Sequence, residues 1–116
     1  MIFSKNLLSG STNGKGILVT GTDTTSSVII HNSIDSTTSM DEVWIYSVNS
    51  SGSDVKLTIE WGETSTEGNI EFTVPAESGL KCIVPGLLLQ NSLIVKAFAG
   101  TGSVLIVHGF VNRITI

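Results

Sequence analysis

The middle of the chain, residues 41–61, constrains the fold more than any other stretch. Two runs of apolar, β-branched and aromatic residues, 43–48 and 55–61, flank a cluster of Ser, Gly, Asn and Asp, which are turn-forming residues. The second run alternates apolar and polar residues without a break, which predicts a strand with one buried face. The apolar residues of that face are Val55, Leu57, Ile59 and Trp61. The first run is apolar on both faces, as in a strand covered on two sides. We expect a β-hairpin here, at the centre of an all-β domain.

Six further segments have strand composition and are separated by turn signals every 8–12 residues. They are residues 16–20, 27–31, 70–74, 80–84, 92–99 and 104–111. Pro85-Gly86 is a turn signal that ends the sixth predicted strand, 87–91 could form at most a helical turn, and the glycines of 100–103 predict a hairpin loop. The pattern predicts an antiparallel β-sandwich, jelly-roll or immunoglobulin-like, of about eight strands.

Residues 1–16 are predicted to form an N-terminal arm that precedes a β-sandwich domain at 17–116. The arm carries four large apolar residues, Ile2, Phe3, Leu7 and Leu8. A free arm with this many apolar residues is unfavourable in water. The arm therefore docks either on its own domain or on a neighbouring molecule.

The last predicted strand is apolar on both faces. Leu105, Val107 and Val111 fall on one face, and Ile106 and Phe110 fall on the other. Either this strand is central in its sheet, or its outer face meets a partner. We take Leu105 and Val107, together with the four apolar residues of the arm, as candidate partner contacts.

Charge and cysteine content exclude several classes of function. Charged residues make up 14% of the 116 residues, the net charge is -4, and the six basic residues are scattered, which argues against binding of nucleic acid. A surface with so little charge suits a protein that partners cover. No stretch approaches the roughly 20 apolar residues of a membrane span, and no signal peptide is evident, so we expect synthesis in a cytoplasm. The single cysteine, Cys82, cannot form an intrachain disulfide and is expected to be packed.

Few residues suggest chemistry, and no catalytic residue, cofactor or metal site is predicted. The two histidines, His31 and His108, lie in apolar strands without metal-ligand spacing, so we interpret them as hydrogen-bonded strand residues. Several glutamates lie close together in sequence and are interpreted as a solvated acidic rim. They are Glu60, Glu63, Glu67, Glu71 and Glu77. A weak calcium site between Glu63 and Glu67 is the alternative.

The aromatic residues offer one more functional alternative. Both tryptophans, Trp44 and Trp61, and the only tyrosine, Tyr46, lie in the central stretch. A domain with so few aromatic residues tends to bury them, so we expect them to anchor the core. If Trp44 or Tyr46 were exposed instead, it could line a carbohydrate-binding patch.

Several segments resemble small virion structural proteins of tailed bacteriophages. They are NLLSGSTNGKGI (6–17), MDEVW (40–44), LTIEWG (57–62), PAESG (75–79), VPGLLLQNSL (84–93) and HGFVNRI (108–114). The resemblance covers nearly the whole chain. Its motifs are turns and strand cores, which specify a fold more than an activity.

Within that group the chain is most similar to head decoration (cement) proteins. The resemblance implies a non-enzymatic homotrimer in the virion capsid that binds the major capsid protein, with no nucleic acid and no membrane as partner. Such proteins sit at threefold positions of the capsid and clamp neighbouring subunits. The alternative within the same group is a tail, neck or fibre-associated module with an adhesive role in binding host or carbohydrate.

Overall fold

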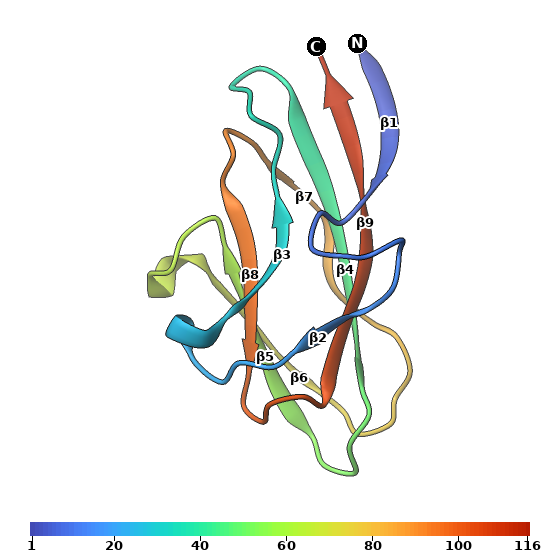
Figure 1. Cartoon of the computed structure of the whole chain (residues 1–116), viewed down its shortest axis with the longest axis vertical. Helices are drawn as coiled ribbons and strands as arrows, with labels where there is room; N and C mark the ends of the chain where they lie inside the picture. The colour runs from blue at the N-terminus through green and yellow to red at the C-terminus, as the bar shows by residue number, and fades with distance from the viewer.

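The computed structural model describes all residues, 1–116, and places nine strands in two antiparallel sheets. Sheet A contains β1 (Ile2–Leu7), β2 (Ile17–Val19), β4 (Met40–Asn49), β7 (Lys81–Leu89) and β9 (Leu105–Thr115). Sheet B contains β3 (Val28–Asn32), β5 (Val55–Trp61), β6 (Asn69–Val74) and β8 (Ile94–Ala99). Two short 3-10 turns complete the structure, η1 (Thr24–Ser26) and η2 (Thr66–Gly68). Figure 1 shows both termini at the same end of the molecule.

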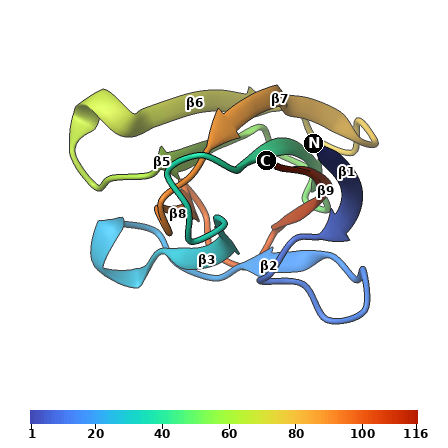
Figure 2. The ribbon, with the colours of Figure 1, turned by 90° about the horizontal axis from the view of Figure 1, so that it is seen from above.

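The strands pair in a nested order. Strands β1 and β2 pair with β9, β3 with β8, β4 with β7, and β5 with β6. Two further pairings, β4 with β9 and β5 with β8, join these hairpin-like pairs into two sheets. This nesting is the arrangement of a jelly roll, in which two Greek keys wrap around one core. Figure 2 shows the two sheets face to face, with β3, β5 and β8 of sheet B on the left and β1 and β9 of sheet A on the right. The predicted antiparallel sandwich is confirmed, and the strand order selects the jelly roll.

The predicted hairpin at 41–61 is wrong, because β4 lies in sheet A and β5 lies in sheet B. Strand β4 lies between β7 and β9, and β5 lies between β6 and β8, so the connection from β4 to β5 crosses the sandwich. Asn49 holds this crossing: its buried side-chain Nδ2 donates to the carbonyl oxygens of Ser53 at 2.8 Å and Val74 at 3.0 Å. The loop at 100–103 also crosses between sheets, so it is not a hairpin loop either.

Strand β7 runs through the predicted turn at Pro85-Gly86 and ends at Leu89. It is an edge strand of sheet A, so one of its sides pairs with no other strand. Pro85 has no N–H to donate, and an edge strand tolerates this because no hydrogen bond is required on the unpaired side. Gly86 has φ +83°, and the register with β4 shifts beside it, between Val43 and Trp44. The segment is therefore a bulged edge strand rather than a turn followed by a helical turn.

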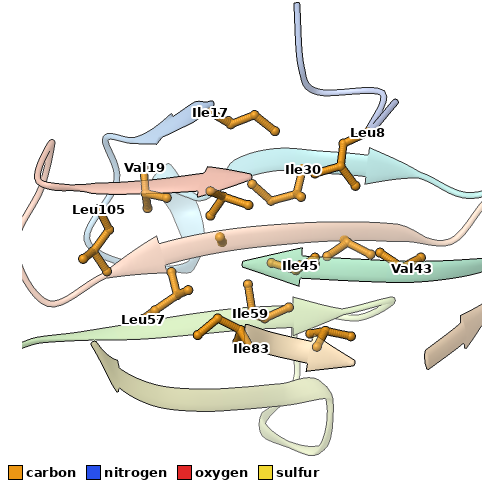
Figure 3. Packing of buried hydrophobic residues seen from close by; sticks show 14 of the residues in the cluster. Leu8, Ile17, Val19, Ile30, Val43, Ile45, Leu57, Ile59, Ile83 and Leu105 are labelled. Atoms are coloured by element: carbon orange, nitrogen blue, oxygen red, sulfur yellow. The ribbon is translucent and has the colours of Figure 1, made fainter. Parts of the chain in front are cut away.

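The core is a single cluster of apolar side chains between the sheets, as Figure 3 shows. Alternate residues of β4 and β9 fill it from sheet A, and Leu57 and Ile59 of β5 fill it from sheet B. Trp61 packs against this cluster, as predicted.

The prediction that the aromatic residues anchor the core was wrong for Trp44 and Tyr46, which are half-buried on the opposite, outer face of β4. Cys82 is exposed rather than packed.

The N-terminal arm is an integral strand. Residues 2–7 form β1, which pairs with residues 110–115 of β9, while β2 continues along the same side of β9. Strand β1 was not recognised because neither of its faces is buried: Ile2 and Phe3 are 67% and 68% exposed. Of the two alternatives for the arm, the structure shows contact with its own domain.

Candidate functional site

The predicted partner-contact residues fall into two groups. Ile2, Phe3 and Leu7 lie exposed along β1, at one edge of sheet A. The other three are core residues, and their assignment as partner contacts was wrong. These three are Leu8, Leu105 and Val107, which are at most 1% exposed.

Leu105 and Val107 are buried because β9 is a central strand, flanked by β4 on one side and by β1 and β2 on the other. Of the two explanations that the sequence left for a strand with two apolar faces, the structure shows the central position in the sheet. The face with Leu105 and Val107 points into the sandwich, so the opposite face, with Ile106 and Phe110, is the outer one. Leu8 follows β1 immediately, and its side chain turns into the core (Figure 3).

The outer face of sheet A is aromatic at its centre. The rings of Trp44 and Phe110 stack at a centroid distance of 6.0 Å and an interplanar angle of 9°, and the two residues are register partners on β4 and β9. A Cβ placed on Gly86 would come within 2.9 Å of Cζ2 of Trp44, so the indole also packs against the backbone of β7. The indole is therefore held between β7 and Phe110.

Polar groups fix this aromatic pair in place. Oε1 of Glu42 accepts hydrogen bonds from Nε1 of Trp44 and from Nδ2 of Asn112, both at 2.8 Å. The hydrogen bonds from Asn112 and Trp44 lower the pKa of the Glu42 carboxyl. On the other side, the ammonium of Lys5 in β1 lies 5.0 Å from the centroid of the Phe110 ring, which is cation–π geometry.

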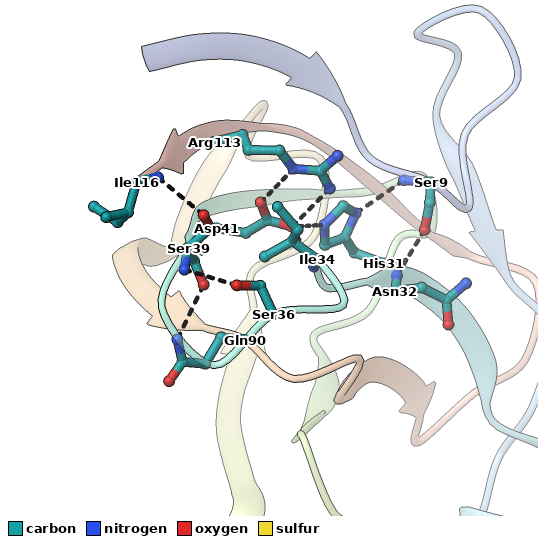
Figure 4. A network of polar contacts seen from close by, with 10 residues as sticks. All are labelled: Ser9, His31, Asn32, Ile34, Ser36, Ser39, Asp41, Gln90, Arg113 and Ile116. Carbon is teal, nitrogen blue, oxygen red and sulfur yellow. Dashed lines mark hydrogen bonds and ion pairs between the residues drawn. The ribbon is translucent and has the colours of Figure 1, made fainter. Parts of the chain in front are cut away.

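A buried polar network lies at the end of the sandwich where both termini are found (Figure 4). Its centre is Asp41, whose side chain is fully buried. Arg113 on β9 donates to both carboxylate oxygens, from Nε at 2.8 Å and from Nη2 at 3.0 Å. The backbone N–H of Ile34 donates to Oδ2 at 3.1 Å, and Nε2 of His31 lies 2.8 Å from the same oxygen.

His31 has no free nitrogen. Its Nδ1 accepts a hydrogen bond from the backbone N–H of Ser9 at 3.0 Å, so the ring hydrogen lies on Nε2 and points to Asp41. The interpretation of His31 as a hydrogen-bonded strand residue is confirmed. With both nitrogens occupied, the imidazole acts as a link between the β1–β2 connection and β4, not as a base or a metal ligand.

Burial raises the pKa of Asp41, but the hydrogen bonds from Arg113 and His31 and the charge of Arg113 outweigh it and hold that pKa below its ordinary value. The same contact with Asp41 raises the pKa of Arg113. Sequence reasoning missed this network because Asp41 and Arg113 are 72 positions apart and nothing local marks them as partners.

The glutamates separate into exposed and buried groups. Glu71 is exposed on β6 and pairs with Lys56 at 2.8 Å, as expected of an acidic rim. Glu60 is only 1% exposed, so its assignment to a solvated rim was wrong. It lines a surface hollow of about 250 Å³ that it shares with Glu63.

The structure has no group of three His, Cys, Asp or Glu side chains that could hold a metal ion. No helix in it is long and apolar enough to cross a membrane. Comparison of the chain with protein-family models, with curated proteins and with solved structures finds no match.

Proposed function

We propose that the chain is a non-enzymatic structural protein of a phage virion, a capsid decoration (cement) protein that binds the major capsid protein shell as a homotrimer and stabilises it. The observation that carries this proposal is the exposed apolar edge of sheet A, formed by β1. Ile2, Phe3 and Leu7 are more than half exposed there, although the chain carries few charges to offset them. Apolar residues gathered at one edge are typical of a surface that an assembly covers.

The backbone of β1 adds to this surface. The strand pairs with β9 on one side only, so its other side presents unpaired N–H and C=O groups. A strand from a neighbouring subunit can add to such an edge, with main-chain hydrogen bonds for affinity and side-chain contacts for specificity. The resemblance to virion proteins and the jelly roll, which recurs among viral capsid domains, support the proposal as analogies of sequence and fold.

The stabilising mechanism is mass action. A protein that binds only the assembled shell lowers the free energy of that shell in proportion to the logarithm of its concentration over its Kd. No catalytic step is required, and the chain acts through its contacts alone.

The first test is the copy number of the protein in purified virions, measured by quantitative mass spectrometry against the major capsid protein. Near-stoichiometric amounts are expected of a protein that decorates the whole shell. A handful of copies would instead favour a tail, neck or fibre-associated module, and absence from virions would overturn both functions.

The second test uses matched phenylalanine variants. Phe3 and Phe72 are both exposed, Phe3 on β1 of sheet A and Phe72 on β6 of sheet B. We expect Phe3→Ser to weaken binding to purified shells about 10-fold or more, as for an apolar anchor of an interface, while Phe72→Ser leaves it unchanged. Equal binding by both variants would remove β1 from the contact surface.

The adhesive alternative has one observation in its favour, since Trp44 and Tyr46 lie on the outer face rather than in the core. The indole of Trp44, however, is held between Phe110 and Gly86, which leaves little of its ring face for stacking against a sugar. Titration with oligosaccharides, followed by tryptophan fluorescence, tests this function. No change at millimolar concentrations would count against it.

A further inference from the structure

Glu60 is a buried carboxylate without a partner. It lies on the outer face of sheet B, in β5 between β6 and β8, and is 1% exposed. Neither of its carboxylate oxygens has a hydrogen-bond partner, and the side-chain Oδ1 of Asn69, its register partner on β6, is also buried and unpartnered. Burial of a carboxylate without a donor is costly, so a donor that the isolated chain does not supply would be bound there favourably.

The surroundings of Glu60 form a hollow of about 250 Å³ at the end of sheet B, where the β5–β6 and β7–β8 connections meet. Leu93 and Ile94 give it apolar walls, while Glu63 and Lys96 line it with long polar side chains. Lys96 is the register partner of Glu60 on β8, yet the ion pairs of the chain do not include it. The carboxylate of Glu60 therefore has no ion pair with Lys96, the cation next to it on β8.

We propose that this hollow binds an arginine side chain of a partner protein, with its guanidinium on the carboxylate of Glu60. Two unpartnered oxygens of one carboxylate match the two parallel N–H donors of a guanidinium. The apolar walls suit the alkyl stem of the arginine, and a cation suits a chain with a net charge of -4. Both oxygens are out of contact with solvent, so entry of the arginine requires a neighbouring side chain of the hollow to move aside.

The arginine comes from a protein other than this one. The chain has a single arginine, Arg113, and that residue is held by Asp41 in the buried network. A second copy of the chain therefore has no free arginine to offer. The hollow is on sheet B and the β1 edge is on sheet A, so this site goes beyond the proposed shell-binding surface and is tested without virions.

The test is a titration of the ¹⁵N-labelled full chain with N-acetylarginine methylamide, followed by NMR shifts of the amides of Gly62, Thr64 and Leu93. The uncharged N-acetylcitrulline methylamide has the same shape and is the ligand control. We expect saturable shifts with the arginine compound and none with the citrulline compound. Equal shifts with both would overturn the proposal, as would equally tight binding of N-acetyllysine methylamide, because that ligand lacks the fork of donors.

Two protein variants complete the test. Glu60→Gln keeps the shape of the side chain but removes its charge, and we expect the Kd for the arginine compound to rise about 10-fold or more. Glu71→Gln removes an exposed carboxylate from the same sheet and should leave the Kd unchanged. Unchanged binding by Glu60→Gln would overturn the proposal, and so would shifts of the same amides by Ca²⁺ alone. The comparison of the two ligands on the unmodified chain stands even if Glu60→Gln fails to fold.

Discussion

Asp41 joins the residues that hold the terminal end of the sandwich together. Its buried carboxylate accepts hydrogen bonds from Arg113, His31 and the backbone of Ile34, which lie on β9, β3 and the β3–β4 connection. Asp41→Asn removes the charge and leaves Arg113 without its partner. We expect a loss of about 2–4 kcal/mol in the free energy of unfolding, and a Tm lower by about 10 °C, because the donors of Arg113, His31 and Ile34 lose the charged acceptor that they share inside the fold.

The matched control is Glu71→Gln, which breaks the exposed pair with Lys56. Exposed ion pairs contribute little, so the expected change is at most about 1 kcal/mol. Urea unfolding of both variants, followed by circular dichroism, measures the difference. Similar small losses in both would mean that the Asp41 network adds no more to stability than a surface pair.

At the scale of single elements, β1 divides into an exposed strand and a buried anchor. Leu7 is 54% exposed and Leu8 only 1% exposed, although the two residues are neighbours. We expect Leu8→Ala to destabilise the domain by about 3 kcal/mol through the cavity it leaves, and Leu7→Ala by less than about 1 kcal/mol. Thermal unfolding of the two variants checks this. Equal, small effects would show that the segment is not anchored in the core.

Deletion of residues 1–9 follows the same logic. It removes β1, Leu8 and the N–H of Ser9 that holds Nδ1 of His31, so we expect a large drop in the Tm of the isolated protein. Deletion of residues 1–3 leaves the anchor in place and should lower the Tm by only a few degrees. If the two deletions had the same small effect, the segment would be an arm that docks only on a partner.

Sequence periodicity located most strands but could not assign their partners. The alternation in 55–61 marks β5 to the residue, because alternation reports which side chains face the core. Pairing depends instead on which distant strands share the core, so β4 and β5 were wrongly joined by the turn chemistry between them. Strand β1 was missed because an edge strand with both faces exposed carries no alternation.

The candidate site was less predictable than the fold. The exposure of Ile2, Phe3 and Leu7 agrees with their selection as contacts. The burial of Leu105 and Val107 could not be predicted without knowing where β9 lies in the sheet. Glu60 sits at a polar position of an alternating strand, yet it is buried, beside residues of the β5–β6 and β7–β8 connections. Burial on the polar face of a strand leaves no periodic signal in the sequence.

At the scale of the whole molecule, three carboxyl groups make the fold sensitive to acid. Hydrogen bonds from Ser26 and Thr25 lower the pKa of Asp23 at the start of η1, as those from Asn112 and Trp44 lower the pKa of Glu42. In Asp41, the effect of Arg113 and His31 exceeds that of burial, and the pKa is again lowered. The folded chain therefore binds fewer protons than the unfolded chain over the acidic range.

The sign of the pH dependence follows from these directions. A group whose pKa is lower in the folded state stabilises the fold above its unfolded pKa, and that contribution disappears as the pH falls through its folded pKa. With ordinary values of 3.8 for Asp41 and 4.5 for Glu42, we expect the urea midpoint to be nearly constant from pH 7 to about pH 5 and to fall below about pH 4. Asp41→Asn should start from a lower midpoint and lose less on acidification, because one of the three groups is already neutral. A midpoint that stays level, or rises, between pH 5 and pH 3 would contradict the assignment of these carboxylates as stabilising partners in the folded chain.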